Sequence, residues 1–294
     1  MSKVLLLFYK ELGRMEDLKE KRELLVINLR EIFQEKNPRL YKFMPDAIFR
    51  WLDKQLHIKD LNEILRMYQY DYGNEFTHNA VFDYFKVTAE VKGLDGIDKN
   101  KRYIVASNHP LGGLDGMLIF DVVSRYFGSG KFLVNDLLTK IPQLRDVFVP
   151  INKYGANSRD AVRMLDELYS TDEPVCIFPA GLASRKIDGK IQDLPWNKHF
   201  ITKAKKYKRD VIPLYVDAQN SEFFYNLARN RKRWGIPWNI ELLFLPKEMF
   251  KMTGGKIKLT FGKPIPFEIF NSEKTPDQWA AYVREEVYAM NNEQ

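Results

Sequence analysis

From residue 86 onward, short strand-like runs alternate with longer helical segments, and this alternation constrains the fold more than any other feature. It predicts an α/β fold, with a mixed, largely buried sheet flanked by helices. The predicted strands are KVTAEVKG (86–93), RYIVAS (102–107), KFLVN (131–135), VFVPIN (147–152), PVCIFPAG (174–181), DVIPLYV (210–216), IELLFLP (240–246) and KIKLTFGKPI (256–265). The predicted helices are DGMLIFDVVSRYFG (115–128), SRDAVRMLDELYS (158–170), KHFITKAKKYK (198–208) and TPDQWAAYVREEVYAM (275–290).

The N-terminal part of the chain has helical spacing instead, so we divide the protein into a helical segment, 1–85, and an α/β domain, 86–294. Two interpretations of the helical segment stay open: a layer packed on the core, or a face that lies on a membrane or covers an acyl-chain groove. The apolar residues at helical spacing are Leu25, Leu29, Ile32 and Phe33 in LLVINLREIF, and Ile48, Trp51, Leu52 and Leu56 in PDAIFRWLDKQL.

Polar residues gather directly after several of the predicted strands. In an open α/β sheet ligands bind in the loops at the carboxyl ends of the strands, so these clusters mark a candidate site. They are Asn108–Gly116, Asn152 and Lys153, Ala180–Arg185, and the loop after DVIPLYV.

The first cluster contains one histidine and one aspartate around a glycine turn, in SNHPLGGLDGM (107–117). An imidazole can take a proton from a hydroxyl at neutral pH, and a carboxylate on its other nitrogen fixes the tautomer that does so. Gly112 and Gly113 allow a tight turn that brings Asp115 toward His109. Asp115 also stands where a helix begins, so a simple helix N-cap is the alternative.

The polar clusters together resemble a known family. NHPLGGLD, VFVPINK, IFPAGLASR and VIPLY occur in the order and approximate spacing of the four sequence blocks of the glycerolipid acyltransferases, the lysophosphatidic acid acyltransferase (PlsC-like) family. AEVKGLDGI before the first block and KLTFGKPIP near the end agree. The resemblance covers residues 86–270 and implies that 86–294 is an acyltransferase domain.

The resemblance implies acyl transfer from a thioester, acyl-CoA or acyl carrier protein, to a lipid hydroxyl, without an acyl-enzyme. It makes His109 the general base and Asp115 the group that orients it, beside an oxyanion site. It implies no bound cofactor and no metal. The positions carried over as substrate-binding are Asn108, Gly112, Gly113, Lys153, Phe178, Pro179, Gly181, Ser184 and Arg185.

The chain departs from the family pattern in ways that bear on the acceptor. Its histidine–aspartate spacing is one residue longer, which resembles the hemolysin-like subgroup that acylates lyso-amino-acid lipids. The third block lacks the usual glutamate, threonine and arginine, and the second block has Lys153 in place of its arginine. An arginine makes bidentate contacts with phosphate, so its loss disfavours lysophosphatidic acid.

We therefore expect a carboxylate-bearing acceptor, an N-acyl glycine or ornithine lipid, whose charge Lys153 and Arg185 meet. The alternatives are a 1-acyl-glycerol-3-phosphate acyltransferase of phospholipid synthesis and a catalytically lapsed lipid-binding subunit.

The net charge of +7 favours an anionic partner. Two basic stretches with aromatic neighbours, 198–209 and 228–234, predict docking to an anionic membrane surface or to acyl carrier protein. A solvated surface is the plain alternative, and nucleic-acid binding does not account for the ordered blocks. The candidate docking residues are Lys203, Lys205, Lys206, Arg231, Arg233 and Trp234.

The other reactive side chains are predicted to be structural. Cys176, the single cysteine, lies in an apolar run and is expected to be a buried, inert thiol. His57, His78 and His199 are given packing or surface roles, and no Cys/His cluster has metal-ligand spacing. Because no apolar run is long enough to span a bilayer, we expect a cytoplasmic protein, peripheral on the inner membrane.

Overall fold

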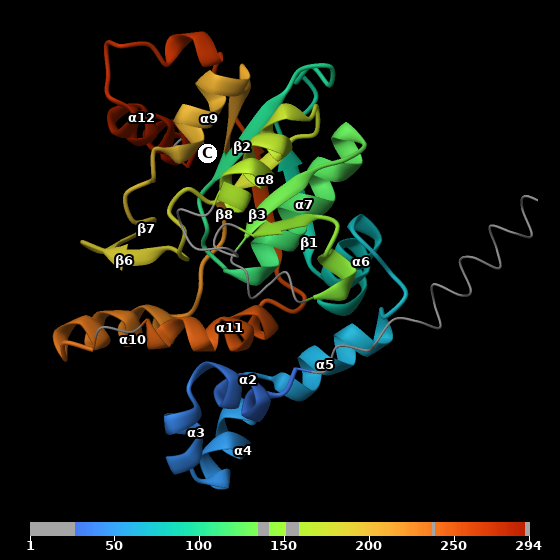
Figure 1. The fold of residues 1–294 in the computed structure, drawn as a ribbon, viewed down its shortest axis with the longest axis vertical. Helices are drawn as coiled ribbons and strands as arrows, with labels where there is room; N and C mark the ends of the chain where they lie inside the picture. The colour runs from blue at the N-terminus through green and yellow to red at the C-terminus, as the bar shows by residue number, and fades with distance from the viewer. Residues whose placement is uncertain (1–26, 135–140, 151–158, 237–238, 292–294) are drawn as a thin grey trace, which may run out of the picture.

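The structure is a computed structural model that describes residues 27–134, 141–150, 159–236 and 239–291. A seven-stranded sheet in the order β1-β9-β8-β2-β5-β3-β4 forms its middle layer (Figure 1). Neighbouring strands are parallel except β8 and β9, which are antiparallel. The strands are β1 (Thr88–Lys92), β2 (Tyr103–Ser107), β3 (Lys131–Val134), β4 (Phe148–Pro150), β5 (Val175–Ile177), β8 (Asp210–Asp217) and β9 (Lys256–Phe261).

Both faces of the sheet are buried along the inner strands β2, β5 and β8, whereas the edge strand β1 is exposed or half-buried. Alternate residues of β2 enter different cores: Tyr103 and Val105 pack into one, Ile104 and Ala106 into the other. The period-two direction of strand side chains produces this split. The prediction of a mixed sheet flanked by helices is confirmed.

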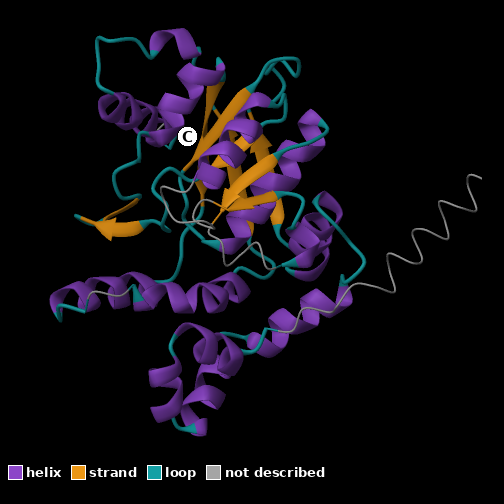
Figure 2. Ribbon diagram, in the orientation of Figure 1, coloured by secondary structure: helices purple, strands orange, loops and turns teal. Residues whose placement is uncertain are grey.

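Helices cover the two faces of the sheet (Figure 2). The apolar face of α7 (Gly113–Phe127) packs into the first core, through Leu114, Leu118 and Val123. The second core contains α8 (Arg159–Ser170), α9 (His199–Tyr207) and α12 (Pro276–Ala289). These four helices correspond to the four that the sequence predicted.

One predicted strand is wrong. Residues 240–246, IELLFLP, form a 3₁₀ turn, η4 (Ile240–Phe244), that runs into helix α11 (Leu245–Lys251). Pro246 stands in the first turn of α11, where its missing N–H costs no helical hydrogen bond. Two further elements were not predicted: the antiparallel hairpin β6 (Arg185–Ile187) and β7 (Lys190–Gln192), and helix α10 (Glu222–Arg233).

The N-terminal segment is helical throughout its described part, as predicted. Its helices are α2 (Leu29–Lys36), α3 (Pro38–Phe43), α4 (Asp46–Gln55), α5 (Ile58–Met67), α6 (Asn74–His78) and the π-turn η1 (Asn79–Tyr84). The later ones share the first core, with Leu65, Phe76 and Val81 buried there. The earlier ones enclose a small core of their own around Phe49 and Leu56, and lie at the far end of the molecule in Figure 1.

The packed face of α4 matches the predicted one only in part, since Leu52 and Leu56 pack into the small core as predicted but Ile48 and Trp51 do not. Phe49 is 1% exposed, whereas Ile48 and Trp51 are 44% and 52% exposed. A short helix shows too few turns for the spacing of its apolar residues to fix which ones face inward. The exposed aromatic residues are therefore surface features of this end of the molecule.

Candidate active site

The predicted histidine and aspartate do meet. His109 Nδ1 lies 3.1 Å from Asp115 Oδ2. The His109 side chain is 15% exposed and that of Asp115 is fully buried. Because the loop after β2 turns back at Gly112, the residue six positions along the chain comes beside the imidazole.

Asp115 is held as an acceptor by backbone amides. Its Oδ2 accepts from Leu111 N at 2.8 Å and its Oδ1 from Gly116 N at 2.8 Å. It stands in the first turn of α7, where the helix dipole favours a carboxylate. Gly112, not Asp115, is the N-cap, so the simple-cap alternative does not describe this residue.

Phe178 fixes the plane of the imidazole. Its ring stacks on His109 with centroids 3.6 Å apart and an interplanar angle of 20°. Phe178 follows β5 and in turn contacts Phe132 of β3, with centroids 5.0 Å apart. Phe178, from the third sequence block IFPAGLASR, therefore packs against one face of the His109 ring.

Asn108 joins the ends of β2 and β8. Its Nδ2 donates to Val216 O at 3.0 Å and its Oδ1 accepts from Val216 N at 2.7 Å. Asn108 is 3% exposed. Asn108 therefore aligns the strand ends beside His109, and its role as a substrate contact stays a prediction.

A second buried carboxylate, Asp193, lies next to the histidine and was not identified from the sequence. Its Oδ1 accepts from Ser184 Oγ at 2.6 Å and from His109 N at 3.3 Å, and its Oδ2 accepts from Trp196 Nε1 at 2.9 Å. Burial raises the pKa of Asp193, and these three hydrogen bonds oppose the rise. The predicted site residue Ser184 thus has its hydroxyl committed to Asp193.

Arg185 is not available to an acceptor, in contrast to the sequence-based expectation. It is 4% exposed, and its Nη2 donates to Glu241 Oε1 at 2.9 Å. Arg231 Nε lies 2.9 Å from Glu241 Oε2, an ion pair without hydrogen-bond alignment. Both arginines pair with the fully buried carboxylate of Glu241. Because an unpaired buried charge is costly, these ion pairs stabilise the fold.

The other predicted substrate-binding residues are Gly113, Lys153, Pro179 and Gly181. Gly181 is an exposed turn residue with φ +68°, and Pro179 is buried, its carbonyl accepting from Asn197 N at 3.0 Å. A Cβ on Gly113 would be in ordinary contact with Met249, 3.6 Å from its sulfur. Lys153 lies outside the described residues.

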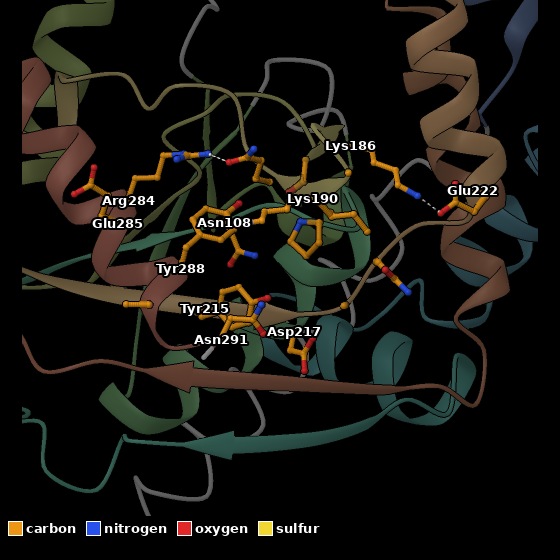
Figure 3. Close-up of a pocket in the computed structure, with 18 residues that line it drawn as sticks. Asn108, Lys186, Lys190, Tyr215, Asp217, Glu222, Arg284, Glu285, Tyr288 and Asn291 are labelled. Atoms are coloured by element: carbon orange, nitrogen blue, oxygen red, sulfur yellow. Dashed lines mark hydrogen bonds and ion pairs between the residues drawn. The ribbon is translucent and has the colours of Figure 1, made fainter. Parts of the chain in front are cut away.

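A cavity of about 930 Å³ adjoins the histidine loop (Figure 3). It lies among the β6–β7 hairpin, the end of β8 and the end of α12. Asn108, Pro110 and Ser184 line it on the side of His109. A lipid head of moderate size fits a space of this volume.

The candidate docking residues do not form one surface. Helices α9 and α10 lie at different ends of the molecule in Figure 1. On α9, Lys203 and Lys206 pair with Asp166 of α8 at 2.7 and 3.0 Å, which lowers the pKa of that carboxyl. Arg231 is only 7% exposed, contrary to its predicted role. Lys205, Arg233 and Trp234 are exposed.

The other singled-out side chains are structural or exposed. Cys176 is fully buried, and burial raises the pKa of its thiol, so the predicted inert cysteine is confirmed. His57 and His78 do have acidic partners, Asp60 at 2.7 Å and Asp121 at 3.4 Å, which the sequence analysis did not find.

The described part of the chain contains no group of His, Cys, Asp and Glu residues arranged to hold a metal ion. Nor does any helix in that part have the length and hydropathy to cross a bilayer.

Comparison with known proteins shows the family of this chain. The model of a family described as "Acyltransferase" matches residues 31–294. The chain belongs to this acyltransferase family. The match extends through most of the helical segment, well beyond the blocks that carried the resemblance.

Two curated relatives of the acyltransferase carry the name "Lyso-glycine lipid O-acyltransferase". The one from Bacteroides thetaiotaomicron is 41% identical over 91% of this chain and 98% of the relative. The one from Phocaeicola vulgatus is 38% identical over 91% of this chain and 96% of the relative. Among solved structures, the 1-acyl-sn-glycerophosphate (LPA) acyltransferase PlsC from Thermotoga maritima is similar, with 23% identity, a TM-score of 0.48 and 86% of each chain covered.

The turn that brings Asp115 to His109 depends on Gly112, which has φ +87°. A Cβ there would lie 2.9 Å from Leu245 Cδ1, and the left-handed conformation costs an L-residue about 1–2 kcal/mol. We expect Gly112→Ala to lower the free energy of unfolding by at least that amount. It also lowers acyl transfer, because the neighbouring Leu111 amide that holds Asp115 shifts. Denaturant unfolding and steady-state kinetics measure the two effects.

The matched control is Gly128→Ala at the other end of α7. Gly128 has φ +85°, but a Cβ there meets nothing within 4 Å. Gly128→Ala should lower the free energy of unfolding but leave the rate of acyl transfer unchanged. Equal activity in the two variants would contradict the assigned role of Gly112.

Proposed function

We propose that the protein moves a fatty acyl group from a thioester donor, acyl-CoA or acyl carrier protein, to the hydroxyl of a lyso-amino-acid lipid of the N-acyl glycine type. The observation that carries this proposal is the His109–Asp115 pair, with the carboxylate fully buried against the imidazole. The names of the two relatives support the acceptor class.

The contact between His109 Nδ1 and Asp115 Oδ2 indicates which imidazole nitrogen carries the proton. An ionised carboxylate only accepts hydrogen bonds, and Asp115 already receives two backbone N–H groups. His109 Nδ1 therefore carries the proton that faces Asp115, and Nε2 keeps its lone pair. This is the tautomer that serves as a general base, and Asp115 stabilises the imidazolium that forms.

The reaction follows in two balanced steps. His109 Nε2 takes the proton of the acceptor hydroxyl while its oxygen attacks the thioester carbonyl, which forms a C–O bond and an oxyanion. The oxyanion then expels the thiolate, the C–S bond breaks, and the imidazolium returns its proton to the sulfur. The start of α7, directly after the histidine loop, supplies partial positive charge for the oxyanion.

The distribution of cations supports a carboxylate rather than a phosphate acceptor. A phosphate needs bidentate or multiple cationic contacts. The arginine of the third block, Arg185, is occupied by Glu241 instead. A single carboxylate places a smaller demand on the site.

We further propose peripheral contact with a membrane through the outer helices α3 and α4. Phe43 is 81% exposed and Trp51 is 52% exposed. Exposed basic residues lie in the same two helices, a composition typical of segments at a lipid headgroup layer. They are Arg39, Lys42, Arg50 and Lys54.

His109→Ala should reduce kcat by about 10²–10⁴, the usual contribution of a general base. Asp115→Asn should also reduce kcat, since the amide cannot stabilise an imidazolium. The control is His199→Ala, at an exposed position at the start of α9, which should leave kcat unchanged. Release of the donor thiol measures all three. A protein that binds lipid but shows no turnover even as wild type would be a lapsed enzyme.

The acceptor is tested by competition. With purified enzyme and one acyl thioester, kcat/KM should be higher for lyso-glycine or lyso-ornithine lipid than for lysophosphatidic acid. We expect this preference because Arg185 is paired with Glu241 and cannot bind a phosphate group. Preference for the phosphate acceptor would show a 1-acyl-glycerol-3-phosphate acyltransferase instead.

Replacing Phe43 and Trp51 together with glutamate should weaken binding to anionic vesicles, because a charged side chain does not enter the headgroup layer. Co-sedimentation with vesicles containing phosphatidylglycerol measures this. Val162→Glu is the control, since Val162 is 50% exposed on α8, away from the outer helices. Equal binding of both variants would remove α3 and α4 from the membrane contact.

A further inference from the structure

The cavity beside the histidine loop contains a cation that no sequence block indicated. Arg284 reaches into it from α12 toward the β6–β7 hairpin (Figure 3). We propose that this cavity binds the amino-acid head of the acceptor and that Arg284 takes its free carboxylate. This assignment rests on the proposed transfer to a lyso-amino-acid lipid and names the part of the site that recognises the head.

The guanidinium has unused hydrogen-bonding capacity. Arg284 Nη2 donates to Gln192 Oε1 at 2.9 Å and to Asp193 O at 2.8 Å. The guanidinium lies over the Tyr288 ring at 4.9 Å, and its Nε is buried without a hydrogen-bond partner in the described chain. A buried unpaired donor is costly, so an anionic ligand that satisfies this guanidinium gains binding free energy.

The neighbouring charges favour the Arg284 side of the cavity for a carboxylate. Lys186, another lining cation, is committed to Glu222 at 2.6 Å. Lys190 is exposed on the hairpin and adds positive charge. The lining acids Asp217 and Glu285 are set apart from the guanidinium: Glu285 points away from it on α12, and Asp217 lies across the cavity in Figure 3.

The acceptor is short enough to bridge neighbouring groups. In an N-(3-hydroxyacyl)glycine the hydroxyl and the carboxylate are roughly 7 Å apart when the chain is extended. One residue, Asp193, contacts both sides of the site: its carboxylate accepts from His109 N and its carbonyl accepts from Arg284 Nη2. Both contacts are to the same residue, so the His109 backbone and the Arg284 guanidinium lie on either side of Asp193.

The test compares two acceptors with purified full-length enzyme: N-(3-hydroxyacyl)glycine and its primary amide, which lacks only the charge. The wild type should prefer the acid by at least about tenfold in kcat/KM, the scale of a charge-assisted hydrogen bond. Arg284→Gln should abolish this preference by raising KM for the acid, with little change for the amide. Arg66→Gln, at an exposed position on α5, is the matched control and should keep the wild-type ratio.

The outcomes separate the two proposals. If the wild type acylates neither compound but acylates lysophosphatidic acid, the proposed acceptor class is wrong. If the wild type prefers the acid and folded Arg284→Gln keeps that preference, Arg284 is not the carboxylate partner. An equal loss of activity on both acceptors would mean that Arg284 only supports the hairpin.

Arg284→Lys decides the matter if the glutamine variant does not fold. It keeps the charge but lacks the planar fork that matches a carboxylate. The preference for the acid should then fall several-fold, and an unchanged ratio would overturn the assignment.

Discussion

The site depends on the immobilisation of the loop that follows β2. Both backbone polar groups of His109 are occupied: its N–H donates to Asp193 and its carbonyl accepts from Ser184 N at 2.8 Å. Pro110 O accepts from Asn220 Nδ2 at 2.8 Å, and Asn108 is bonded to β8 on both sides of its amide. The imidazole is therefore presented by a segment anchored to the hairpin and to β8. Such pre-organisation would serve the general-base role proposed for His109.

Buried carboxylates provide much of this rigidity, and each is compensated. Asp115 and Asp193 receive N–H or O–H donors, and Glu241 receives two guanidinium groups. Removing one partner of such a group leaves a charge that the interior cannot solvate. Ser184 and Arg185 consequently hold the hairpin through Asp193 and Glu241.

The sequence was sufficient for the sheet, for α7, α8, α9 and α12, and for the histidine–aspartate pair. These depend on local periodicity or on a short turn, which neighbouring residues determine. It was insufficient for Asp193, which lies far along the chain from His109 and meets it only through the fold. The prediction of a strand at 240–246 was wrong for a related reason. The buried Glu241 is stabilised by ion pairs with Arg185 and Arg231, and the spacing of apolar residues does not reveal these pairs. A signal for Asp193 existed in its position before the buried Trp196, but a lone aspartate in a loop is too common to single out.

The same long-range pairing explains why a basic sequence is a poor guide to where this protein meets anions. Two of the three α9 lysines pair with Asp166, and Arg231 shares the buried Glu241 with Arg185, so these cations are already paired within the folded chain. Arg284 had no basic neighbour in the sequence to mark it, yet it borders the cavity next to the histidine loop with an unpaired N–H. The positive charge that an anionic ligand can contact depends on which lysine and arginine side chains are not paired with a carboxylate in the folded chain.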